Sequence, residues 1–170
     1  LGLGQGMAGN NQLQTLVLNG CMIGNEGLEN MVTGFGETKN NSLMHLNLES
    51  NWIKGAEGGR QLSLLLQRFQ QLKVLILTNN PLGPLGARAL ALGLAAAIHL
   101  KWLELFNCEF GNDGVKYLIP KGQENRSLTN LRSCLHSEQR SKNVSIFYNY
   151  YLKLSPPPQV ILGSLSHYAP

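Results

Sequence analysis

The sequence has little of what a disulfide-stabilised, membrane-spanning or metal-binding protein requires. Its 170 residues include three cysteines, an odd number, and no apolar run approaching about 18 residues, the length of a membrane-spanning helix. The chain does not open with the basic and then apolar segments of a secretory signal peptide. Its four histidines lack the spacing of a metal site. We therefore expect no disulfide framework, no membrane span, no metal and no cofactor.

Candidate catalytic residues are equally few. Cys134 and His136 stand two residues apart, but they lie in a segment without a recognisable scaffold. Gly2, Gly4 and Gly6 superficially resemble a dinucleotide-binding loop, yet no strand precedes them, and such a loop must follow one. The sequence therefore offers no credible active site and favours a protein that is not an enzyme.

Three short sequences bear on the cellular location. Asn-x-Ser, the acceptor for N-glycosylation, begins at Asn40, Asn125 and Asn143. This pattern is common by chance in an Asn-rich chain, and the cysteine content favours a reducing compartment. We therefore expect the cytoplasm, or the nucleus, and keep an extracellular location as the alternative.

One leucine-containing sequence motif occurs four times, at intervals of 30, 29 and 28 residues. It has the form Leu-x-x-Leu-x-Leu, then two residues, an Asn or Cys, one residue and a final apolar side chain; the copies begin at Leu13, Leu43, Leu72 and Leu100. A fixed period of this length is typical of a repeat protein. The alternating Leu-x-Leu core of each copy predicts a short strand with one buried face.

The second half of each repeat predicts a helix. The first copy contains an apolar stripe with i, i+3, i+4 and i+7 spacing: Leu28, Met31, Val32 and Phe35. Residues 87–98 of the third repeat are rich in alanine and leucine, which are among the best helix formers. The apolar helix positions of the second and fourth copies are Leu62, Leu65, Leu66, Val115, Leu118 and Ile119. The expected fold class is α/β: a leucine-rich repeat solenoid with a curved parallel sheet inside, helices outside and about four complete repeats.

The Asn or Cys after each strand predicts a buried ladder. At Cys21, Asn51, Asn80 and Cys108 the chain turns inward. An amide or a thiol at this position can satisfy backbone groups of its own turn and of the neighbouring repeat. We therefore expect both asparagines to stabilise the turns and both cysteines to be buried.

The glycine pattern after the ladder resembles that of the ribonuclease-inhibitor-type leucine-rich repeats. It occurs in residues 23–27, 82–86 and 110–114 as an apolar residue followed by Gly-x-x-Gly. That subfamily also includes the C-terminal arrays of the NOD-like receptors and the repeats of the Ran GTPase-activating protein. The resemblance covers roughly residues 1–131 and implies the solenoid fold. It leaves the function open, because these relatives bind unrelated partners through different surface residues.

The composition changes after residue 131. Residues 1–131 contain ten basic and nine acidic side chains, a net charge of +1, whereas residues 132–170 contain four and one, a net charge of +3. We expect a leucine-rich repeat domain over 1–131, an N-terminally truncated array in which Pro120 ends the last helix early. Residues 132–170 form a basic tail with an aromatic run and three consecutive prolines, expected to be poorly ordered. A strand at 146–152 that caps the last repeat, or a segment appended by alternative splicing, are the alternatives.

The side chains between the strand leucines face away from the core and align in three rows on the concave side of the sheet. The rows are Thr15, His45, Val74 and Trp102; Val17, Asn47, Ile76 and Glu104; and Asn19, Glu49, Thr78 and Phe106. Trp102 and Phe106 flank Glu104, and large aromatics beside a charge are typical of binding hot spots. The candidate partner-binding residues are His45, Asn47, Glu49, Ile76, Thr78, Trp102, Glu104 and Phe106. The alternative is that the tail or a further repeat shields these aromatics. Trp52 lies outside the rows, on a turn, where partial packing on the neighbouring turn is expected.

The sequence favours a non-enzymatic scaffold that binds a partner protein on the concave face, with neither nucleic acid nor a membrane as partner. The solenoid lacks the basic stripe of a nucleic-acid-binding protein because the excess positive charge belongs to the tail. Uncapped repeat ends would in addition allow self-association. The family resemblance implies two alternatives, a GTPase activator similar to the Ran-activating family and the ligand-sensing repeat region of an innate immune receptor. A GTP hydrolysis assay with a panel of small GTPases separates the activator from the scaffold.

Overall fold

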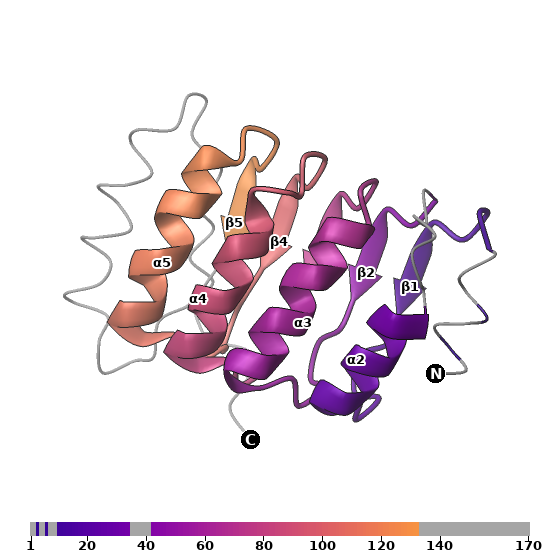
Figure 1. The fold of residues 1–170 in the computed structure, drawn as a ribbon, viewed down its shortest axis with the longest axis horizontal. Coiled ribbons are helices and arrows are strands. Elements are labelled where there is room, and N and C mark those ends of the chain that lie inside the picture. The colour runs from indigo at the N-terminus through magenta and orange to yellow at the C-terminus, as the bar shows by residue number, and fades with distance from the viewer. Residues whose placement is uncertain (1–2, 4–5, 7–9, 35–41, 133–170) are drawn as a thin grey trace, which may run out of the picture.

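The computed structural model describes residues 3, 6, 10–34 and 42–132. Within residues 10–34 and 42–132, helices alternate with short strands: β1 (Thr15–Val17), α2 (Gly24–Gly34), β2 (His45–Asn47), α3 (Gly55–Arg68), β3 (Val74–Ile76), α4 (Gly83–Leu94), β4 (Trp102–Glu104), α5 (Gly111–Glu124) and β5 (Asn130–Arg132). The strands form one parallel sheet in the order β1-β2-β3-β4-β5, and the helices lie side by side over one of its faces (Figure 1). The predicted leucine-rich repeat solenoid is confirmed. Its fifth strand extends one residue beyond the domain boundary predicted at residue 131.

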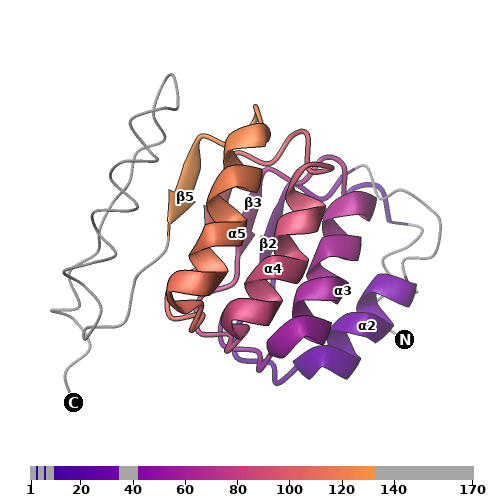
Figure 2. The same cartoon turned by 60° about the vertical axis from the view of Figure 1, so that its left-hand side comes forward.

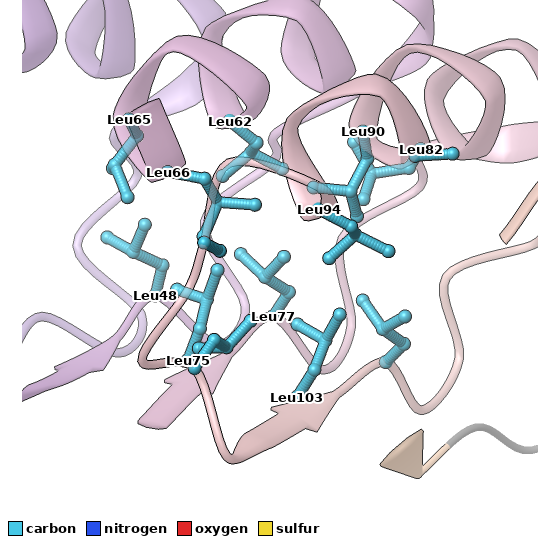
Figure 3. Packing of buried hydrophobic residues seen from close by; sticks show 14 of the residues in the cluster. Leu48, Leu62, Leu65, Leu66, Leu75, Leu77, Leu82, Leu90, Leu94 and Leu103 are labelled. Carbon is cyan, nitrogen blue, oxygen red and sulfur yellow. The ribbon is translucent and has the colours of Figure 1, made fainter. Parts of the chain in front are cut away.

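The strand leucines form the core together with the inner faces of the helices. Leu46, Leu75 and Leu103 are register partners in adjacent strands, and all three are buried. Figure 3 shows Leu75 and Leu103 facing leucines of α3 and α4, among them the fully buried Leu62 and Leu90. Fully burying one leucine side chain contributes roughly 1.5–3 kcal/mol. The leucine spacing of the sequence therefore determines which face of each strand meets the helices.

The spacing of the two layers makes the strand side concave. Neighbouring strands lie about 4.8 Å apart, whereas packed helices lie about 8–10 Å apart, so the array bends with the sheet on the inside. Figure 2 shows the same helices stacked along the outer side. The sheet face turned away from the helices is called the concave face below, and the outer side of the helices is called the convex face.

Glycines determine how closely α3 and α4 approach each other. A β-carbon on Gly59 would lie 2.8 Å from the Cα of Gly86, closer than such atoms can pack. Further along the same pair of helices, a β-carbon on Gly93 would lie 2.6 Å from the Cα of Ser63. A side chain at either glycine would therefore push the two helices apart.

The predicted asparagine ladder holds the turns after the strands. The side-chain oxygen of Asn51 accepts hydrogen bonds from the backbone N–H groups of Cys21 (3.0 Å) and Ile23 (3.3 Å), one repeat earlier. Its side-chain nitrogen donates to two backbone carbonyls, at 2.7 and 2.9 Å. Asn80 repeats this arrangement, and its oxygen accepts from the N–H of Asn51 at 3.1 Å. Both asparagines are fully buried, so each ties its own turn to the turn before it.

The two ladder cysteines differ from each other. Cys108 is 1% exposed, and its thiol donates to the carbonyl of Leu77 at 3.3 Å, as the ladder predicts. Cys21 is exposed, so the prediction that both cysteines are buried is wrong for this residue. Cys21 belongs to the first turn of the described array, and no preceding turn among the described residues covers it. Burial at this position thus depends on the neighbouring repeat.

The fourth helix does not end early at Pro120, which corrects the prediction. α5 continues to Glu124, although proline removes one helical hydrogen bond. The turn beyond the proline buries Gly122, and the N–H of Asn125 bonds to the carbonyl of Lys121. Packing of the last turn outweighs the one missing bond.

The third helix ends at Leu94, before the predicted limit at residue 98. There the chain tightens into a turn, in which the N–H of Ala97 bonds to the carbonyl of Leu94 at 3.2 Å. The side chain of Asn125 donates to the carbonyls of both residues, at 2.6 and 3.0 Å. The carbonyls of Leu94 and Ala97 thus have hydrogen-bond donors although the helix does not continue.

The apolar helix positions predicted from the sequence are buried wherever they are described: Leu28, Met31, Val32, Leu62, Leu65, Leu66, Val115, Leu118 and Ile119. Phe35 lies outside the described residues. The predictions for the tail, including its capping strand and its poor order, also lie outside them from residue 133 onward.

Candidate functional site

The three predicted rows lie on the concave face as the sequence indicated. Register partners across the sheet run from Thr15 through His45 and Val74 to Trp102, and from Val17 through Asn47 and Ile76 to Glu104. The third row lies just after the strands. The backbone carbonyls of Glu49, Thr78 and Phe106 each accept a hydrogen bond of 2.9 Å from a backbone N–H group of the preceding repeat. The eight predicted partner-binding residues therefore share one surface. Their role in binding stays a prediction.

Trp102, Glu104 and Thr78 form a hydrogen-bonded cluster at the β3–β4 side of this surface. The indole N–H of Trp102 donates to one carboxylate oxygen of Glu104 at 3.4 Å, along the same strand. The hydroxyl of Thr78, on the neighbouring repeat, donates to the other carboxylate oxygen at 3.3 Å. All three side chains are half-buried. The carboxylate and the indole are therefore held in place on the face of the sheet.

The remaining predicted residues extend this cluster in two directions. Ile76 is the register partner of Glu104 and is half-buried, like Phe106. His45 is exposed, and Asn47 accepts a hydrogen bond from the backbone N–H of Glu49 at 2.8 Å. The concave face thus combines an apolar part on β3 and β4 with a polar part on β2.

The convex face has a different chemistry. Arg60 and Glu57 form an exposed ion pair of 2.7 Å on α3. The hydrogen bonds from Arg60 and Gln61 lower the pKa of the Glu57 carboxyl to about 2. On α4, the exposed side chains include Leu85 and Leu92. This side supplies matched control positions for tests of the concave face.

Asn125 has a structural role that its sequence pattern does not indicate. The residue is 6% exposed, and its side-chain oxygen accepts the backbone N–H groups of Ser127 (3.0 Å) and Leu128 (3.1 Å). Its side-chain nitrogen already donates to two carbonyls of the preceding repeat. A glycan cannot be attached to this nitrogen in the folded protein. The Asn-x-Ser pattern therefore marks a further buried asparagine, at the other end of the repeat from the ladder position of Asn51 and Asn80.

Trp52 lies on the turn after β2 and outside the concave rows, as predicted, but only about a third of it is covered. Its side chain is 67% exposed, and its backbone has a positive φ of 61°. Met22 and Glu109, at the equivalent positions of other repeats, also have a positive φ, so this conformation belongs to the turn of the repeat.

Two classes of site find no support among the described residues. Over residues 10–34 and 42–132, no group of three histidine, cysteine or acidic side chains could hold a metal ion. None of the described helices is long and apolar enough to cross a membrane.

Comparison with known proteins agrees with the repeat geometry. A family model described as Leucine Rich repeat matches residues 9–32, 39–62, 70–91 and 96–118, together more than half of the chain. No curated protein matches. Among solved structures, the tropomodulin C-terminal domain of Caenorhabditis elegans is similar with a TM-score of 0.63 and 18% identity, over 90% of this chain and 94% of that one. At this identity the likeness concerns the fold alone. The chain belongs to the leucine-rich repeat family.

Proposed function

We propose that this protein is a non-enzymatic scaffold that binds a partner protein on its concave face. The observation that supports this most is the cluster of Trp102, Glu104 and Thr78, whose two hydrogen bonds fix an indole and a carboxylate on the face away from the helices. Preorganised groups lose little side-chain freedom on binding, which favours affinity. Tryptophan is also among the residues most enriched in binding hot spots.

The composition of the face favours a protein as partner. As far as β4, its three rows contain Glu49 and Glu104 but no lysine or arginine. On β5 the register partner of Glu104 is Arg132, and one arginine is not the basic stripe that a nucleic-acid backbone requires. Half-buried apolar side chains, Val74 and Ile76, lie beside Trp102 and Glu104 in the sheet. An apolar centre with polar margins is typical of a protein–protein interface.

We further propose a repeat type and a cellular compartment for this protein. The repeats are of the ribonuclease-inhibitor type, which the Gly-x-x-Gly helix starts support: Gly24, Gly83 and Gly111 each begin a helix with a positive φ. The compartment is reducing, the cytoplasm or the nucleus, in keeping with the use of Cys108 as a buried hydrogen-bonding thiol. GTPase activation and ligand sensing rank second, because no residue of the chain is matched to either role.

Site-specific photo-crosslinking tests which face meets the partner. A benzophenone amino acid replaces exposed His45 on the concave face in one variant and Leu92, 70% exposed on the convex face, in the other. We expect specific crosslinked products from position 45 and few from position 92, at equal expression in cells. Specific products from position 92 alone would contradict the concave assignment.

A further inference from the structure

A hollow lies on the turns at the carboxyl ends of the strands, apart from the three rows of the concave face. It has a volume of about 240 Å³ and is lined by Ser50, Trp52, Asn79, Pro81, Asn107 and Glu109. These six residues, called the turn pocket below, come from the three consecutive turns after β2, β3 and β4. The volume is below the roughly 300–1,000 Å³ of pockets that enclose whole small ligands, so it suits a single side chain.

Neither packing nor backbone preference accounts for a tryptophan at position 52. Its side chain is 67% exposed, so the indole contributes little to the core. Its φ of 61° matches those of Met22 (51°) and Glu109 (58°) at the equivalent turn positions, so these turns require the left-handed backbone but not a tryptophan. A large indole that neither the core nor the turn requires points to a binding role. The exposed indole at the pocket wall is consistent with that role.

The polar side chains of the pocket are fixed by hydrogen bonds from one turn to the next. The amide nitrogen of Asn107 donates to the side-chain oxygen of Asn79 at 3.0 Å. The amide nitrogen of Asn79 in turn lies 3.3 Å from the hydroxyl of Ser50 and 3.4 Å from a carboxylate oxygen of Glu49. The pocket therefore rests on an ordered polar base with a carboxylate at its margin.

The repeat spacing places the Trp52 indole and the Glu109 carboxylate at a separation that one cation can bridge. Adjacent strands lie about 4.8 Å apart, so the turns that carry Trp52 and Glu109 are about 10 Å apart, with Pro81 on the turn between them. A cation interacts with an aromatic face within about 6 Å of the ring centre. It pairs with a carboxylate within about 4 Å. One cation between the two side chains can satisfy both distances.

The charges around the pocket favour a cation. On the turns 49–55, 78–83 and 106–111 the charged residues are Glu49, Lys54 and Glu109. The backbone of Lys54 bonds to the side chain of Asn25 at 2.8 and 3.0 Å, toward α2, and Lys54 does not line the pocket. Two acidic side chains thus border the hollow without a basic one in its lining.

We propose that the turn pocket binds an arginine side chain of a partner protein, with the guanidinium stacked on Trp52 and paired with Glu109. A guanidinium is planar, stacks on aromatic faces and carries five N–H donors, so it fits an indole, a carboxylate and amide oxygens better than an ammonium does. The proposal does not depend on binding at the concave face: the six lining residues include none of those assigned there, and Glu49 of that face only borders the hollow.

An NMR titration of the full chain with N-acetyl-arginine amide tests this proposal without a partner. N-acetyl-citrulline amide, neutral and nearly identical in shape, is the matched ligand. Trp52→Asn and Glu109→Gln remove the two recognition groups, and asparagine tolerates the positive φ at position 52. The control variants are Met22→Asn, at the equivalent turn position of the first repeat, 80% exposed with a φ of 51°, and Glu29→Gln on α2.

We expect saturable shifts of the Trp52 indole and of the Asn79 and Asn107 side-chain amides, with a dissociation constant on the order of millimolar. Trp52→Asn should weaken binding roughly 2- to 30-fold and Glu109→Gln roughly 2- to 5-fold. The control variants should bind as the native chain does, and citrulline should shift these signals far less. Absence of saturable shifts overturns the proposal, as does equal response to citrulline or an equal loss in Met22→Asn. Backbone spectra that match outside the substituted turn show that each variant is folded.

Discussion

The backbone N–H of Asn51 donates a hydrogen bond to the side-chain oxygen of Asn80, 3.1 Å away and one repeat later in the chain. Asn51 uses its own side-chain oxygen in the same way toward Cys21, one repeat earlier. The turns after β1 and β2 are thus each fixed by the asparagine one repeat later. Since the concave rows and the turn pocket both adjoin these turns, the ladder positions both surfaces.

Replacing either ladder asparagine should destabilise the protein. Asn51→Ala and Asn80→Ala each leave buried N–H and carbonyl groups without their partners, which costs about 1–3 kcal/mol. The measurement is the free energy of unfolding in denaturant. Asn19→Ala, an exposed asparagine, is the control and should change it by less than about 0.5 kcal/mol. Unchanged midpoints in both ladder variants would show that these hydrogen bonds do not hold the turns.

The two described cysteines should differ in reactivity. In a Cys134→Ser background, a thiol reagent should modify exposed Cys21 quickly and Cys108, 1% exposed, only after unfolding. Cys21→Ser and Cys108→Ser variants assign the two rates. Rapid modification of Cys108 in the folded protein would contradict its place in the ladder.

Two helix glycines should respond in opposite ways to alanine. Gly59→Ala forces a β-carbon against Gly86 and should cost about 1–3 kcal/mol, the usual effect of overpacking. At Gly122 a β-carbon would lie 3.6 Å from Leu128 and Leu131, an ordinary contact distance. Gly122→Ala should therefore stabilise α5 by about 0.4–1 kcal/mol. Thermal unfolding of the two variants measures both effects, and equal stability would refute the close helix approach.

The fold could be predicted from the sequence because one spacing rule places every strand leucine. The same rule places the asparagine ladder and the rows of the concave face, since side chains alternate along a strand. Cys21 shows where the rule stops. Cys21 occupies the same position of the repeat motif as Cys108. Burial at this position also requires the turn of the preceding repeat, which the motif of a single repeat does not contain.

Tertiary contacts also explain the other differences between the sequence-based predictions and the structure. Pro120 has a strong local preference to end a helix, which packing of the last turn of α5 overcomes. Asn125 carries a glycosylation pattern, yet its side-chain nitrogen donates hydrogen bonds to two backbone carbonyls about 30 residues earlier in the chain. The turn pocket joins residues of three repeats, and no single repeat contains its pattern.

The most direct test of the concave-face account measures the affinity of the crosslinked partner for matched variants. Trp102→Ala and Phe106→Ala should each weaken binding by about 2–4 kcal/mol, roughly 30- to 1000-fold, because both truncate aromatic anchors. Arg60→Ala and Arg88→Ala, on the convex face, should leave the dissociation constant nearly unchanged, once all four variants are shown to be folded. If the arginine variants abolish binding and the aromatic variants retain it, the partner binds the convex side and the account is wrong.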